Sequence, residues 1–87
     1  MDFTSFLKER HLIIPGARKM KEVSANQYNS RLNSMRDQDI YSGENQLDEL
    51  IIEKINNKYA NSSNEYERTI TYYLEFKKYL NQHKSTN

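Results

Sequence analysis

The 87-residue sequence contains no cysteine and no tryptophan. Without cysteine, the chain can form neither a disulfide framework nor a cysteine-based zinc site. The same absence fits a reducing compartment, and we expect a cytoplasmic protein. No segment approaches the roughly 18 consecutive apolar residues of a membrane span, and the N-terminus lacks the layout of a signal peptide. We therefore expect no membrane partner.

Glycine and proline are also scarce, with two glycines and one proline in the whole chain. These residues are the strongest breakers of regular structure, so their rarity predicts uninterrupted helices. The length fits one small domain, and seven tyrosines and three phenylalanines are available for its core. We expect an all-α fold, a compact bundle of four to five short helices over residues 1–81, followed by a flexible polar tail over 82–87.

The first helix is predicted from a capping residue and the apolar residues behind it. Asp2 is a suitable N-cap, and Phe3, Phe6 and Leu7 follow at helical spacing. This helix is expected to end near residue 10 or 11. The apolar run 12–16 that follows includes Pro15, which favours an extended backbone before it. We expect a loop there, with a short strand as the alternative.

Three further helices follow from capping signals and apolar spacing. Ser24 and Gln27 form an S-x-x-Q capping box, with Leu32 and Met35 on the apolar stripe behind it. An apolar helix is expected over residues 45–59, with one apolar side formed by Leu47, Leu50, Ile51, Ile55 and Tyr59. A second capping box, the S-x-x-E of Ser62 and Glu65, is expected to open the last and longest helix, which should end near residue 81. Its helical stripe is Tyr66, Ile70, Tyr73, Leu74, Lys77 and Leu80.

The net charge of +1 conceals three segments of opposite charge. Residues 1–36 carry seven Lys/Arg against three acids, a net of +4. Residues 37–67 carry two against eight, a net of −6, and residues 68–87 carry four against one, a net of +3. A fold that brings the two end segments together would present one basic and one acidic face. Concentrated positive potential attracts polyanions, so DNA or RNA is the first partner to consider.

Sequence motifs of catalysis are missing. The chain contains no G-x-S-x-G, no phosphate-binding loop and no G-x-G-x-x-G. His11 and His83 are not spaced with carboxylates as metal ligands would be, and the adjacent acids Asp48 and Glu49 point in diverging directions on a helix. We therefore expect a chain that is not an enzyme, with no cofactor, no metal and no small-molecule substrate.

Basic and small polar residues precede the expected second helix, lie along it and recur on the last one. Lysine and arginine suit phosphates, whereas asparagine and serine suit base edges in a major groove. An ordinary solvated surface is the competing interpretation. Tyr72 and Tyr79 lie near the edges of the apolar stripe of the last helix. Either partial burial in the core or stacking on a base or a protein partner is consistent with these positions. The candidate DNA-binding residues are Arg18, Lys19, Lys21, Asn29, Ser30, Arg31, Asn33, Arg36, Arg68 and Lys78.

The segments 3–7 and 23–32 have an "F…L" helix followed by an "S-A-x-x-Y-x-x-x-L" helix, and 64–80 closes with "L-x-F-x-x-Y-L". This order resembles the N-terminal core-binding, SAM-like domain of phage integrases and other tyrosine recombinases, over roughly residues 3–81. The resemblance implies a bundle that clamps one side of double-stranded DNA with its second and last helices, while the acidic third helix lies away from it. The implied contacts are Asn29, Ser30, Arg31, Asn33, Arg36, Arg68, Thr71 and Lys78.

Two hypotheses remain. The first is a non-catalytic DNA-binding module; the family's catalytic residues belong to a separate domain with no counterpart here, so a C-terminal catalytic domain in a longer chain is implied. The alternative is a small phage or mobile-element protein-interaction module. It would bind a host protein through the acidic segment 37–67 or the edge formed by Tyr72 and Tyr79.

Overall fold

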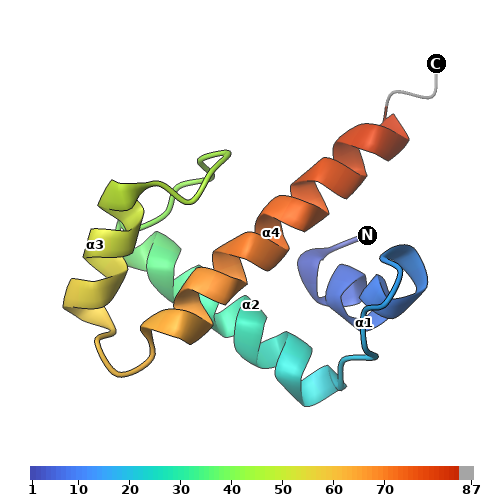
Figure 1. Ribbon diagram of the computed structural model, residues 1–87, viewed down its shortest axis with the longest axis horizontal. Helices are drawn as coiled ribbons and strands as arrows, with labels where there is room; N and C mark the ends of the chain where they lie inside the picture. The colour runs from blue at the N-terminus through green and yellow to red at the C-terminus, as the bar shows by residue number, and fades with distance from the viewer. Residues whose placement is uncertain (85–87) are drawn as a thin grey trace.

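The computed structural model describes residues 1–84, which form four helices and no strand (Figure 1). The helices are α1 (Phe3–Ile13), α2 (Glu22–Asp37), α3 (Glu49–Lys58) and α4 (Ser63–Lys84). Helix α4 runs through the molecule and packs against each of the other three, and α1 also packs on α2. The expected small all-α bundle is confirmed over the described part of the chain. None of the helices in residues 1–84 combines the length and apolar character that a membrane span requires.

The core draws apolar side chains from all four helices. Each predicted stripe supplies buried residues, and Phe76, which lies off the main stripe of α4, is buried as well because Phe3 and Phe6 cover it at ring-centre distances of 5.9 and 5.4 Å. Helix α4 is therefore covered on two sides. The large apolar side chains that are most completely buried are Phe6, Leu7, Leu32, Met35, Tyr41, Ile51, Ile55 and Ile70.

Helix α1 continues two residues beyond its expected end and takes in half of the apolar run. Leu12 is 74% exposed on this added turn, whereas Ile13 and Ile14 pack partly against the core. Ile14 is extended, with φ −108° and ψ 116°, as the following proline requires. Gly16 has φ +82°, a conformation that favours glycine, and it turns the chain toward α2. The run 12–16 is thus a helix end and a loop, and the strand alternative was wrong.

The starts of α2 and α3 differ from those expected from the sequence. Helix α2 begins at Glu22, so Ser24 lies within its first turn, and Lys21 stands at the N-cap without a side-chain capping bond. The predicted capping box of α2 was wrong. Helix α3 begins later than expected, behind Asp48, whose carboxylate accepts a hydrogen bond from the Ile51 backbone nitrogen at 2.9 Å.

The ends of α4 differ from each other in how well they were predicted. The helix begins at Ser63, and the carbonyl of Ser62 accepts backbone hydrogen bonds from Glu65 and Tyr66, as at an N-cap position. At the other end α4 extends to Lys84, three residues past the expected end. The first half of the expected polar tail is therefore helical, and residues 85–87 lie outside the described part of the chain.

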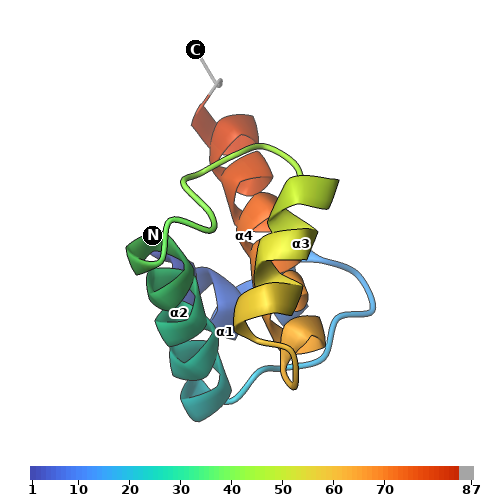
Figure 2. The same ribbon diagram turned by 90° about the vertical axis from the view of Figure 1, so that its left-hand side faces the viewer.

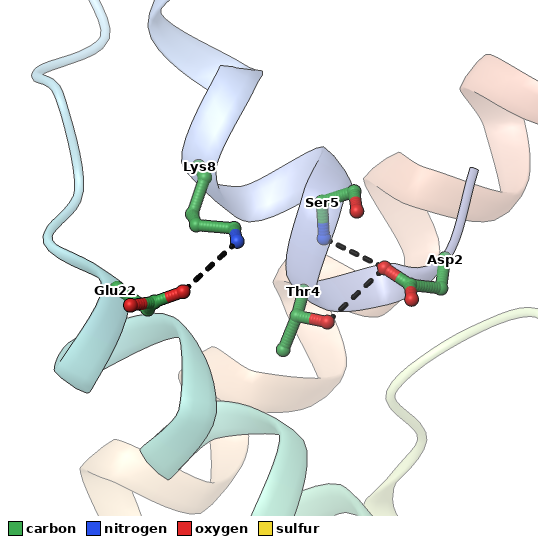
Figure 3. A network of polar contacts seen from close by, with 5 residues as sticks. All are labelled: Asp2, Thr4, Ser5, Lys8 and Glu22. Carbon is green, nitrogen blue, oxygen red and sulfur yellow. Dashed lines mark hydrogen bonds and ion pairs between the residues drawn. The ribbon is translucent and has the colours of Figure 1, made fainter.

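Helix α1 starts at an exposed carboxylate cap (Figure 3). One oxygen of Asp2 accepts hydrogen bonds from the Ser5 backbone nitrogen at 2.8 Å and from the Thr4 hydroxyl at 3.1 Å. The Ser5 backbone bond is the main reason that the pKa of Asp2 lies below its ordinary value. Nearby, Lys8 and Glu22 form an ion pair at 3.4 Å that joins α1 to α2 (Figure 3). Such an exposed pair adds little stability.

We expect acid to weaken the start of α1 through this cap. Because the pKa of Asp2 is lower in the folded than in the unfolded chain, the stabilisation is present above the ordinary pKa of aspartate and is lost as the pH falls through the lowered value. The variant Asp2→Asn keeps an oxygen acceptor but does not titrate. The melting temperature of the wild type relative to this variant should therefore fall on acidification. A difference that stays constant with pH would contradict the role of the ionised cap.

Candidate nucleic-acid interface

The connector between α1 and α2, residues 14–21, carries the densest group of exposed positive charge. Figure 2 shows it in light blue as an open loop that passes outside the helices. Arg18, Lys19 and Lys21 are all exposed, and none of them forms an ion pair with another residue of the described chain. These three sequence-predicted residues therefore lie together with their charges unneutralised.

The connector borders a hollow of about 790 Å³ against α1, α2 and α4, which we call the connector hollow. Its wall contains four basic residues and, within the described chain, no acidic one. Apolar side chains and two tyrosines complete it. The lining residues are Arg10, Ile14, Pro15, Gly16, Ala17, Arg18, Lys19, Met20, Lys21, Ser24, Tyr28 and Tyr72.

Two tyrosines from different helices meet at the floor of this hollow. Tyr28 of α2 and Tyr72 of α4 are in edge-to-face contact, with ring centres 5.0 Å apart. Three guanidinium groups surround the pair. The central carbon of Arg10 lies 4.7 Å from the centre of the Tyr72 ring, and that of Arg31 lies 5.2 Å from the centre of the Tyr28 ring. A hydrogen bond to the Tyr28 side chain raises the pKa of Arg68. The cations and rings stabilise one another.

Arg10 is held in this arrangement by a carboxylate from α4. Its Nε and Nη2 donate to the two oxygens of Glu75 at 2.7 and 3.0 Å, and this bonding raises the pKa of Arg10. Because the pair is partly buried and bidentate, it has a fixed geometry. Arg10 therefore supports Tyr72 more than it adds free charge. Arg10 was not among the residues predicted from the sequence, because its partner Glu75 lies 65 positions away in the chain.

The other predicted residues of α2 are spread along the helix. Ser30 and Asn33 are exposed, while Asn29 and Arg31 are partly buried. Arg36 lies at the far end, where its Nη2 donates to the Tyr73 hydroxyl at 2.9 Å. At a rise of about 1.5 Å per residue, Arg36 is about 22 Å along the axis from the connector end of α2.

The predicted residues of α4 also separate. Arg68 joins Tyr28 beside the connector hollow. Thr71 is exposed, and its hydroxyl donates to the Glu67 carbonyl at 3.1 Å. Lys78 is exposed and lies about 15 Å along the axis of α4 from Arg68. It borders other hollows than the connector hollow. The structure thus groups Arg18, Lys19, Lys21, Arg31 and Arg68 around the tyrosine pair, and it leaves Arg36 and Lys78 apart from them.

The exposed acids of α3 lie at a distance from the connector cations. Figure 1 shows α3 on the left of the molecule and α1 with the start of the connector on the right. Glu49 and Glu53 are exposed on α3, whereas the carboxylate of Asp48 is used as the helix cap. The acids of α3 are thus separate from the connector cations, whereas Glu65 lies beside Arg68 on α4 and Lys77 bonds to Gly43 and Asn45 of the acidic segment.

The chemistry of these side chains suits a ligand that carries negative charge. Exposed cations beside partly buried rings offer ionic contacts and an aromatic surface within one hollow.

In comparisons with known proteins, no family model matches the chain, and no curated protein or solved structure matches it significantly.

Proposed function

We propose that this chain is a non-catalytic DNA-binding module that holds the phosphate backbone of a duplex against the connector and the adjoining surfaces of α2 and α4. The observation that supports this proposal is the group of unneutralised cations Arg18, Lys19 and Lys21, with no acidic residue in the wall of the connector hollow. Arg68 adds an exposed cation from α4. Lysine and arginine that neutralise phosphates release counterions, so the affinity is mainly electrostatic, with little sequence readout.

The kinship with the core-binding domain of tyrosine recombinases belongs to the same proposal. The order of four helices is consistent with it, but α2 itself has no net charge, because Glu22 and Asp37 balance Arg31 and Arg36 and the connector cations precede the helix. The separation of Arg36 and Lys78 from the connector hollow favours a contact that starts at the connector and extends along α2, rather than one evenly shared by α2 and α4. A catalytic domain that follows in a longer chain would then act on the DNA that this module holds.

A protein partner for the acidic side is the second candidate function. On α3, Leu50 is 60% exposed beside the exposed carboxylates Glu49 and Glu53. An apolar side chain within a charged surface is a common feature of protein contacts. Reversal of both acids, as Glu49→Lys with Glu53→Lys, separates the two functions: it should abolish binding of a basic protein partner and leave duplex binding intact.

The test is a backbone-amide NMR titration with a generic duplex at low salt. We expect shifts concentrated in the connector, in the first half of α2 and around Arg68, because those segments carry the grouped cations. If four phosphates are neutralised, affinity should fall about a hundredfold between about 50 and 200 mM salt. Shifts centred on α3, or binding that is insensitive to salt, would refute the proposal.

A further inference from the structure

We infer that the connector hollow accepts a single unpaired nucleotide, with its phosphate on the cations of the connector and its base against the tyrosine pair. The inference rests on the proposed function and extends it, because a clamp on the backbone of a regular duplex needs no pocket. The ligand chemistry is a phosphate joined to a flat heterocycle. An unpaired position in a DNA strand and a free nucleotide both provide it.

The size of the hollow fits such a group. Its volume of about 790 Å³ falls within the roughly 300–1,000 Å³ of small-molecule sites. A base within an intact duplex is held in the stack and cannot enter a pocket of this kind. A base that is unpaired, or extruded from the helix, can be taken up between aromatic and apolar side chains.

The wall combines two chemistries that one simple ligand would not require together. An inorganic anion accounts for Arg18, Lys19 and Lys21 but not for the rings, and an apolar ligand accounts for the rings but not for the cations. Met20 and Ile14 extend the apolar surface beside Tyr28 and Tyr72. A nucleotide uses both parts, since every base has a face that stacks on an aromatic ring.

The tyrosine pair is held in place before any ligand arrives. Arg10 lies over Tyr72 and is itself fixed by Glu75, while Arg31 lies over the ring of Tyr28. Side chains that are ordered in advance lose little conformational freedom on binding, which favours affinity.

The experiment compares two DNA molecules with the same total number of nucleotides, one a blunt duplex and the other a shorter duplex with a single-stranded tail. Fluorescence anisotropy gives the two affinities, and 2-aminopurine in the tail reports stacking by loss of its fluorescence. We expect the tailed molecule to bind about tenfold tighter, with quenching of the probe. The variant Tyr72→Leu should remove this preference and the quenching, because it should weaken binding of the tailed molecule more than binding of the blunt duplex. The quenching measurement on the wild type does not depend on how that variant folds.

The outcomes separate the inference from the proposed function. Equal affinities without quenching would overturn the inference and leave the duplex clamp in place, whereas no binding to either DNA would overturn both. Free deoxyadenosine triphosphate is the second arm. If it restores the probe fluorescence without displacing the blunt duplex, the hollow binds the nucleotide unit itself. If it competes equally with both molecules, it acts only as a polyanion and counts against the inference.

Discussion

Replacement of Ile70 by alanine is expected to remove a large part of the free energy of unfolding and to lower the melting temperature strongly. Ile70 is fully buried on α4, the helix that packs against the other three. Truncation of a buried isoleucine to alanine lowers the free energy of unfolding by about 2–5 kcal/mol. The loss arises because the removed carbon atoms no longer contribute their burial free energy and because a cavity remains. A domain of this size has a free energy of unfolding that begins at about 5 kcal/mol. Thermal unfolding followed by circular dichroism measures the loss.

The neighbouring residue supplies the matched control. Thr71 is exposed, and its hydroxyl bonds only to the carbonyl of its own helix, so Thr71→Ala should change the free energy of unfolding by less than about 0.5 kcal/mol. The two variants share the same helix and the same loss of a branched side chain. If both unfold at the wild-type midpoint, the buried face of α4 is wrongly assigned.

The burial of Ile70 was predictable because apolar periodicity reports which face of a helix is buried. The same reasoning placed Leu32 and Met35 of α2, and Ile55 of α3, in the core, but it was wrong for Leu50, which is exposed on α3. Each stripe repeats over several turns, so its signal is the sum of many side chains. This redundancy is why the helix types and the core were predicted well from one sequence.

Helix ends depend on single residues, and there the sequence was less informative. Ser24 had the pattern of an N-cap, yet α2 begins at Glu22, and α3 begins behind Asp48 instead of near residue 45. A cap contributes only about 1 kcal/mol, so the path of the connecting chain decides where a helix starts. At Ile14, where the following proline restricts the backbone directly, the predicted extended geometry was confirmed.

In the candidate site, too, the features that depend on neighbouring residues were predicted, and those that depend on distant residues were not. The charge pattern identified the basic connector, because Arg18, Lys19 and Lys21 are close in sequence. The contact of Tyr28 with Tyr72, and the pairing of Arg10 with Glu75, join residues that are far apart in the chain. No spacing rule connects such residues, since they meet only through the way α1 and α2 pack on α4.

The connector also provides the sharpest test of the DNA contact. We expect the double variant Lys19→Glu with Lys21→Glu to bind duplex DNA about a hundredfold more weakly than the wild type at about 50 mM salt. Each phosphate contact contributes about 0.9 to the salt slope, which corresponds to about tenfold in affinity at that salt concentration. The slope of the logarithm of affinity against that of salt should flatten by about 1.8 for two lost contacts. Both lysines are exposed, and a glutamate at position 21 lies at the N-terminus of α2, where negative charge is favourable.

The double variant Lys54→Glu with Lys58→Glu is the control for net charge. It reverses two exposed lysines of α3 and changes the total charge by the same amount, but on the acidic side of the molecule. If long-range attraction alone held the DNA, the two double variants would lose affinity to a similar degree. If the connector is the contact, only the first flattens the salt slope, because counterions are released only where phosphates are met. Equal losses would therefore count against a defined interface, and a loss confined to the connector variant would locate the DNA on one face of the bundle.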